Sequence, residues 1–199
     1  MVKSAYSFQT KKEKVEQHII VVWVDNESGV LARVVGLFSG RGYNIDSLAV
    51  AEVDKKKNIS RITISTSGTP KVLQQIKLQL GKLVPVHKVA DFPRNKMTLM
   101  REMALLKVVS SNIKLKRAKK LCQKYKYAVL DKTSKSFVFE VSALKKEIDD
   151  LIKKLQPLGL ASASRTGVVA MTKGSEVYKK DWRSIYENVL WKGYWRKFN

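Results

Sequence analysis

The chain has 199 residues, of which 39 are Lys or Arg and 17 are Asp or Glu, so its formal net charge is +22. An apolar share of 44% lies close to the globular average, which excludes a wholly disordered chain despite the charge. The longest apolar run, residues 19–24, is far shorter than the roughly 20 residues of a membrane-spanning helix. We therefore expect one domain or two small ones, with no membrane span.

We expect residues 1–16 to be a polar extension. They contain Lys3, Lys11, Lys12, Glu13 and Lys14 but neither an apolar core nor an arginine, which argues against a secretory signal and an Arg-rich transit peptide. The single cysteine excludes an internal disulfide. A reducing, cytoplasmic location fits both observations.

Apolar periodicity predicts a first unit with the order βαββαβ over residues 17–92. Its opening run is continuously β-branched and aromatic, as in a buried strand, and ends at the turn-forming residues 25–29. Gly40 and Gly42 end the first predicted helix, and Pro70 suits the first turn of the second. The predicted elements are strands at 18–24, 44–53, 60–66 and 83–91, with helices at about 31–38 and 70–80.

The same order recurs after a linker at residues 93–99. The second unit, residues 100–174, has predicted strands at 101–109, 127–131, 137–141 and 160–171 and helices at 113–126 and 144–155. The inward stripe of the last helix is predicted to comprise Leu144, Ile148, Leu151, Ile152 and Leu155. The predicted fold class is therefore α+β, with two ferredoxin-like βαββαβ domains in tandem. Units this small favour dimerisation, and residues 175–199 form a basic aromatic tail.

Positive charge is concentrated in the second half. Residues 1–92 carry a net charge of +6 and the remainder carry +16, with seven cations and no acid between residues 114 and 126. Such a run can bind nucleic acid, because clustered cations displace counterions from phosphates. The solvated face of an amphipathic helix is the favoured interpretation, since aromatic residues are not interleaved for base stacking. Its apolar stripe would comprise Ala118, Leu121, Cys122 and Tyr125.

No set of residues predicts a catalytic or metal site. His18 and His87 lie in or beside apolar strands without ligands at metal-binding spacing, so structural roles are favoured. Asp149 and Asp150 lie among lysines, which favours ion pairing over acid catalysis. Cys122 lies on an inward stripe, which favours burial over reactivity.

The turn at residues 25–29 is the best candidate for a ligand site. It ends a strand and opens a helix, where free N–H groups and the helix dipole favour an anion. Gly29 allows a ligand to approach the backbone closely, although Ser28 as a simple N-cap is an alternative explanation of the turn. Asn26 and Asn44 supply amides, which can meet the carboxylate and ammonium of an amino acid.

Residues 26–50 (NESGVLARVVGLFSGRGYNIDSLAV) closely resemble the regulatory small subunits of acetohydroxyacid synthase, also called acetolactate synthase. Further similar blocks are SRITI (60–64), REMALLKV (101–108) and SRTGVVA (164–170). The resemblance implies an N-terminal ACT domain and a C-terminal ferredoxin-like domain. It also implies a non-catalytic protein that activates a separate catalytic large subunit carrying thiamine diphosphate, Mg²⁺ and FAD. Feedback inhibition by a branched-chain amino acid, usually valine, would act through this protein.

The resemblance also implies a homodimer through the ACT domains, with each ligand at the interface between two chains. Ordinary core packing is an alternative role for Val30, Leu31 and Ala51, and the choice among valine, leucine and isoleucine stays open. A basic nucleic-acid-binding module is the second hypothesis, and an enzyme is the weakest. The effector-binding positions implied by matching motif are Asn26, Gly29, Val30, Leu31, Asn44, Ile45, Val50 and Ala51.

Overall fold

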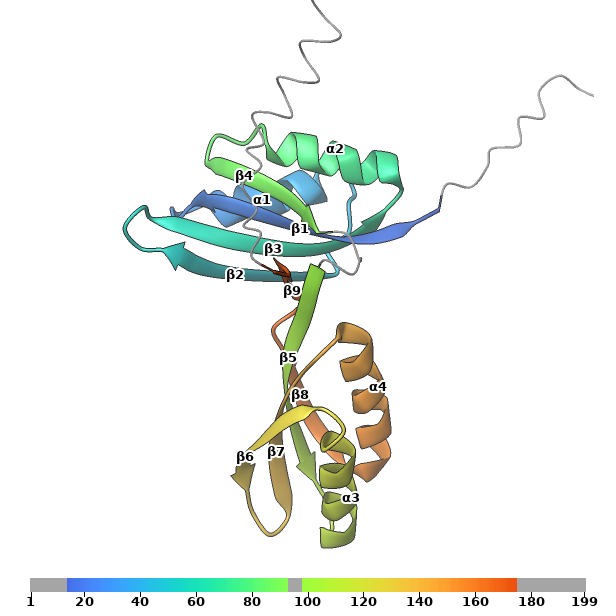
Figure 1. The fold of residues 1–199 in the computed structure, drawn as a ribbon. Coiled ribbons are helices and arrows are strands. Elements are labelled where there is room, and N and C mark those ends of the chain that lie inside the picture. Colours follow the sequence, from blue (N-terminus) through green and yellow to red (C-terminus); the bar gives the residue numbers. More distant parts are fainter. Residues whose placement is uncertain (1–13, 93–97, 175–199) are drawn as a thin grey trace, which may run out of the picture.

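The computed structural model describes residues 14–92 and 98–174, which form two sheet-and-helix domains (Figure 1). The predictions for the N-terminal extension, the linker and the basic aromatic tail fall wholly or mainly outside these residues. In the N-terminal domain the antiparallel sheet has the order β2-β3-β1-β4. Its elements are β1 (Glu16–Asp25), α1 (Val30–Ser39), β2 (Ser47–Asp54), β3 (Ile59–Gly68), α2 (Pro70–Leu80) and β4 (Val86–Phe92).

Strand β1 is apolar from residue 19 to residue 24 because both of its faces are buried there. Ile20, Val22 and Val24 point into a core shared with α1 and α2, whereas Ile19 and Val21 belong to a second cluster on the opposite face. The side chains of a strand alternate between faces, so covering both faces removes the polar alternation that one solvated face would leave. The helices form as their sequences predict, with Pro70 opening α2 after its N-cap Thr69.

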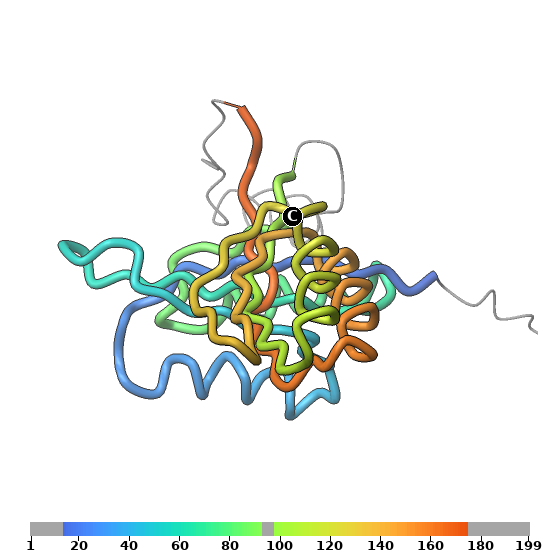
Figure 2. The backbone as a smooth tube through the Cα atoms, turned by 90° about the horizontal axis from the view of Figure 1, so that it is seen from below, coloured from blue at the N-terminus to red at the C-terminus, as the bar shows by residue number. Residues whose placement is uncertain are grey.

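The C-terminal domain repeats this arrangement, which confirms the prediction of two ferredoxin-like units. Its sheet has the order β6-β7-β5-β8, and β9 pairs with the first part of β5. Helices α3 and α4 lie side by side on one face of the sheet (Figure 2). The elements are β5 (Thr98–Val109), α3 (Asn112–Cys122), β6 (Lys126–Lys132), β7 (Ser136–Ala143), α4 (Lys145–Leu155), a short 3₁₀ turn (Gln156–Leu158), β8 (Leu160–Arg165) and β9 (Val169–Thr172).

The prediction of a single strand at 160–171 is wrong, because residues 166–168 interrupt it and separate β8 from β9. Gly167 adopts a φ of 79°, in the left-handed region that favours glycine. Thr166 makes the last backbone hydrogen bond before this turn, donating its N–H to the carbonyl of Met103. The two short strands then pair with different parts of β5, which is longer than the predicted 101–109.

Other predicted boundaries also differ. Strand β4 begins at Val86 rather than at residue 83, because residues 81–85 form a turn. Strand β2 begins at Ser47 rather than at residue 44, because side chains take the place of ladder bonds around Asn44. Helix α3 ends at Cys122, where a turn leads into β6. Leu144 is 44% exposed at the N-cap of α4 and does not join the buried stripe of that helix.

The two domains meet through a small apolar cluster. Val168, just before β9, and Ala170, within β9, pack on Ile19, Ala90 and Phe92 of the N-terminal sheet. Figure 1 shows β9 and the start of β5 at this junction. Part of the sheet face away from α1 and α2 is thus covered by the C-terminal domain.

One further property concerns membranes. Within residues 14–92 and 98–174, every helix is too short or too polar to cross a bilayer.

Core packing in the C-terminal domain predicts a position-dependent cost of shortening leucine. Leu106 is fully buried on β5, whereas Leu130 on the edge strand β6 is 55% exposed. We expect Leu106→Ala to lower the free energy of unfolding by about 2–5 kcal/mol, since it leaves a cavity. Leu130→Ala is the matched control, with a cost under about 0.5 kcal/mol. Urea denaturation measures both, and equal costs would contradict the assigned core.

Candidate functional site

The start of α1 presents backbone N–H groups beside a glycine. Gly29 is the N-cap, with a φ of 83° and no side-chain cap, so the alternative that Ser28 caps the helix is wrong. A Cβ built on Gly29 meets no atom within 4 Å. The first turn of a helix has N–H groups without intrahelical partners, and here the glycine leaves the approach to them open. An anionic group can therefore bind at this terminus.

Asn26 is fixed to the neighbouring strand beside this terminus. Its Oδ1 accepts a hydrogen bond from the Ser60 hydroxyl at 2.9 Å, and its backbone N–H donates to the Asn58 carbonyl at 2.7 Å. Asn58 has a φ of 53° in the β2–β3 turn, which lets the turn reach back to β1. Since Ser60 uses Oδ1, the Asn26 side chain offers its Nδ2 as a donor to a ligand.

Asn44 lies in a different hydrogen-bond network. Its Nδ2 donates to Oδ1 of Asp46 at 2.7 Å, and its carbonyl accepts from the Thr66 hydroxyl at 2.6 Å. Oδ2 of Asp46 in turn accepts from Gln17 and Ser67, each at 3.0 Å. These bonds hold the segment that precedes β2 against the beginning of β1 and the end of β3.

The structure does not bring Asn26 and Asn44 together within one chain. Asn26 lies beside Ser60 at the start of β3, whereas Asn44 lies beside Thr66 near its end. Six residues of strand separate these positions by about 20 Å at ~3.3 Å per residue. One chain therefore cannot place both amides on one amino acid, contrary to the simplest expectation from sequence.

The remaining predicted effector positions divide into buried and exposed residues. Val30 is 4% exposed and packs in the core, and Ile45 packs partly against it. Val50 pairs with Ile62, which points into the core, so Val50 lies on the face that the helices cover. Ala51 is exposed on the same edge strand. We define the α1–β2 patch as the exposed apolar residues of these two elements, Leu31, Val35, Val50 and Val53.

Comparison with known proteins decides the family. The model of the AHAS small subunit-like ACT domain matches residues 20–88, and that of the small subunit of acetolactate synthase matches residues 101–174. The acetolactate synthase isozyme 3 small subunit of Escherichia coli is 34% identical over 164 residues, covering 82% of this chain and 99% of that protein. The chain belongs to the acetolactate synthase small subunit family.

Two other comparisons support this assignment. The small subunit of Aquifex aeolicus is 34% identical over 174 residues, which is 87% of this chain and 90% of that protein. The crystal structure of the small subunit from Thermotoga maritima matches with a TM-score of 0.73 and 30% identity, covering 80% of this chain and 99% of that one. The ACT fold and a role in allosteric regulation of branched-chain amino acid synthesis follow from membership of this family.

Both histidines singled out in the sequence have structural partners. His18 contacts Asp91 at 2.7 Å, and His87 contacts Asp25 at 2.5 Å. Burial raises the pKa of the Cys122 thiol to about 12, so the thiol is protonated and unreactive at neutral pH. In the described part of the chain, no group of three or more His, Cys, Asp or Glu residues is placed to hold a metal ion.

An ion pair with a buried carboxylate borders the cleft between the domains. Arg165 contacts Glu102 through two nitrogens at 2.5 and 2.9 Å, and Glu102 is only 3% exposed. The hydrogen bonds to Glu102 raise the pKa of Arg165 further above its usual range. Burial alone would raise the pKa of Asp149, but hydrogen bonds and charge from Arg165 and Lys145 outweigh it and hold that pKa below its usual value. Asp149 is therefore an ion-pairing residue, as its sequence context predicts.

The cleft has a volume of about 350 Å³ and joins residues of both domains. Gly167 lies against Ser47, and a Cβ on Gly167 would lie 3.0 Å from the Cβ of Ser47. The backbone N–H of Val168 also donates to the Ser47 hydroxyl at 3.5 Å. Sequence reasoning missed this contact, although the SRTGVVA block contains Gly167. It also missed the hydrogen bonds of Ser60 and Asp46. In each case, the partner residues lie far away in the chain.

The buried carboxylate of Glu102 predicts a large cost for removing its partner, Arg165. In Arg165→Met the carboxylate of Glu102 loses its partner in a buried setting, so we expect a loss of about 3 kcal/mol or more in unfolding free energy. Adding Glu102→Gln should recover part of that loss, because the uncompensated charge disappears. Lys145→Met is the matched control, since its pair with Asp149 is half-exposed and contributes under about 1 kcal/mol. Urea denaturation of the three variants and the parent protein tests this, and equal losses for both single cation variants would contradict it.

Proposed function

We propose that this chain is the regulatory subunit that activates the catalytic subunit of acetolactate synthase and makes it sensitive to feedback inhibition by valine. Family membership across both domains supports the role, and the glycine-started terminus of α1 supports the ligand. Catalysis belongs to the large subunit, which carries thiamine diphosphate, Mg²⁺ and FAD in the family that the sequence resembles. The complex works in the cytoplasm.

The effector site forms between two copies of this chain. Strand β2 starts near Asn44 and runs toward the turn that holds Asn26. When two β2 edges meet antiparallel about a two-fold axis, the start of one strand lies beside the end of the other. The Asn44 end of one chain then approaches the Asn26 end of its partner. Asn26 and Asn44 are about 20 Å apart within one chain, but Asn26 of one chain lies near Asn44 of the other in this dimer.

The α1–β2 patch supplies the apolar contact for this dimer. Its four residues are between 37% and 52% exposed, and β2 is an edge strand whose outer hydrogen-bonding groups face away from β3. An exposed edge flanked by apolar side chains is suited to pairing with a second strand. A second copy of the chain covers the patch and closes each ligand site at once.

In this site each part of valine meets a matching group. Backbone N–H groups at Gly29 and the following turn hold the carboxylate, aided by the helix dipole. Asn26 of one chain and Asn44 of the other provide polar contacts, and Leu31 and Val50 line the apolar side. Val30 and Ile45 support these groups from the core.

The contact between Ser47 and Gly167 carries the signal to the C-terminal domain. A ligand that shifts Asn44 also shifts its hydrogen-bonded neighbour Asp46, and Ser47 follows directly in the chain. Ser47 leaves no room for a Cβ at Gly167, and its hydroxyl accepts from the Val168 N–H, so a movement of Ser47 displaces this segment. Couplings of this kind are typically about 1–3 kcal/mol, which changes activity severalfold or more.

A charge at the helix terminus should abolish valine binding. Gly29→Asp places a carboxylate where the ligand's carboxylate binds. The new side chain begins in open space, and Asp is a residue type that tolerates a positive φ. We expect isothermal titration to lose the valine signal, while activation of the catalytic subunit persists. Gly29→Asn, which has the same shape without the charge, should retain measurable binding. Unchanged valine inhibition in Gly29→Asp would contradict the helix-terminus site.

Mixing two defective variants tests the two-chain site. Asn26→Ala and Asn44→Ala should each lose valine binding alone. In a hybrid dimer one site combines both substitutions, and the other regains both asparagines. An equal mixture with random exchange therefore recovers about a quarter of the sites, as titration stoichiometry measures. If the mixture recovers none although both variants unfold like the parent protein, the two asparagines do not act across an interface.

A further inference from the structure

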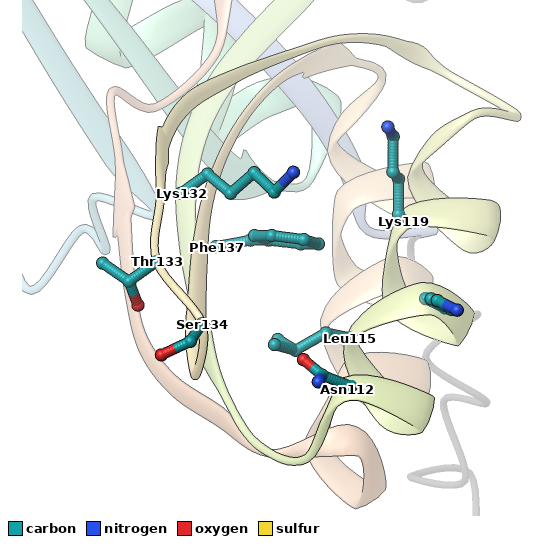
Figure 3. A pocket seen from close by; sticks show the side chains of 8 residues that line it. Asn112, Leu115, Lys119, Lys132, Thr133, Ser134 and Phe137 are labelled. Atoms are coloured by element: carbon teal, nitrogen blue, oxygen red, sulfur yellow. The ribbon is translucent and has the colours of Figure 1, made fainter.

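The C-terminal domain contains a cavity that the regulatory role does not use. It has a volume of about 560 Å³ and lies between α3 and the turn that joins β6 to β7 (Figure 3). Cavities that hold small ligands usually measure about 300–1,000 Å³, so the size fits one organic molecule. The residues that line it are Asn112, Leu115, Lys116, Lys119, Lys132, Thr133, Ser134 and Phe137.

The floor of the cavity is apolar and rigid. Leu115 is 2% exposed and Phe137 is 9% exposed, so both side chains are held by the core. The Phe137 ring also makes an edge-to-face contact with Phe139, with ring centroids 5.7 Å apart. A flat ring of a ligand can pack on such a floor without reordering it.

The walls are cationic. Lys116 and Lys119 project from α3, and the Lys132 ammonium lies 5.9 Å from the centre of the Phe137 ring. Figure 3 shows Lys132 along one face of the ring and Lys119 on the opposite wall. The lining residues include three lysines and no carboxylate. Such a wall favours a ligand with two or more negative charges, and lysine is a common point-charge partner of phosphate.

The tertiary structure supplies the aromatic contact that the basic segment lacks in sequence. Residues 114–126 contain cations without suitably placed aromatic residues. Folding places Phe137, from a strand beyond the β6–β7 turn, against the lysine-bearing face of α3. A phosphate and a flat ring can therefore be recognised in one place.

We propose that this cavity binds a small phosphate ester with a flat ring, of the size and chemistry of a nucleoside monophosphate. The phosphate lies among Lys116, Lys119 and Lys132, and the ring packs on Phe137 and Leu115. Because α3 and the β6–β7 turn bound the cavity on two sides, a single nucleotide fits it better than a continuous strand. The site is independent of the proposed valine site, since it uses the C-terminal domain alone.

Titration of the full chain with three matched probes tests the ligand class. Adenosine 5′-monophosphate has both the ring and the phosphate, ribose 5-phosphate lacks the ring, and adenosine lacks the phosphate. We expect adenosine 5′-monophosphate to bind saturably with 1:1 stoichiometry. The affinity for ribose 5-phosphate should be lower by about fivefold or more, because the ring contact is lost. Adenosine should bind more weakly still. Equal binding of ribose 5-phosphate, or an absence of saturable binding by all three, would overturn the proposal.

Matched lysine variants test the location. Lys119→Gln should weaken binding of adenosine 5′-monophosphate by about tenfold, since one charged contact is removed. Lys120→Gln removes the same charge from the next residue of α3, which does not line the cavity, and should change affinity by less than about twofold. Equal effects of the two variants would show a diffuse electrostatic attraction and overturn the cavity assignment.

A nucleic-acid strand is the alternative source of the same chemistry. The probe for this alternative is a single-stranded DNA of twelve nucleotides. The small-molecule proposal would be overturned if this DNA bound far more tightly than the mononucleotide and its affinity fell steeply between 50 and 200 mM salt. Valine titration of the Lys119→Gln protein should match that of the parent. If neither the parent nor the Lys119→Gln protein bound valine, the result would count against the proposed effector site alone. The titration with adenosine 5′-monophosphate would still test the cavity independently.

Discussion

The connection from β1 through α1 to β2 is the constraint on which the proposed regulation depends. A helix of ten residues spans about 15 Å, so its start and the loop after its end lie at opposite ends of the sheet. Gly29 and Asn26 belong to the first end, and Asn44 and Asp46 to the second. No rotation of side chains can join these ends, because both are hydrogen-bonded to opposite ends of β3. A ligand that needs both groups requires a second chain, which makes dimerisation part of the proposed site.

The same constraint gives the loop before β2 two neighbours. One side of this segment faces the proposed effector, and Ser47 at its end lies against Gly167 of the C-terminal domain. The junction is small, with Val168 and Ala170 packed on the otherwise bare face of the N-terminal sheet. A small junction suits a regulatory protein, because a shift at the loop is not absorbed by a large rigid interface. The ion pair of Glu102 and Arg165 fixes the residue two positions before Gly167 and so limits where Gly167 can move.

Charge has different consequences in the two domains. In the N-terminal domain a helix terminus and amides are proposed to bind a zwitterion with no net charge. In the C-terminal domain three lysines surround an apolar floor, which suits a compact anion. The guanidinium of Arg61 shows a third use of a cation. It stacks 5.4 Å from the centre of the Trp23 ring and donates to the Ala170 carbonyl, and its burial lowers its pKa. Net charge therefore gives little information about function until its surroundings are known.

The sequence by itself determined the two βαββαβ units, the buried first strand, the structural roles of the histidines and the family. These depend on local periodicity, turn residues and motifs, which are contained in short segments. Only the tertiary structure decided that Asn26 and Asn44 lie at opposite ends of one sheet, that β8 and β9 are separate, and that Phe137 lies against the lysines of α3. These properties depend on strand register and on contacts between residues far apart in the chain. A pattern read along one segment cannot fix them, because many distant partners are compatible with the same local sequence.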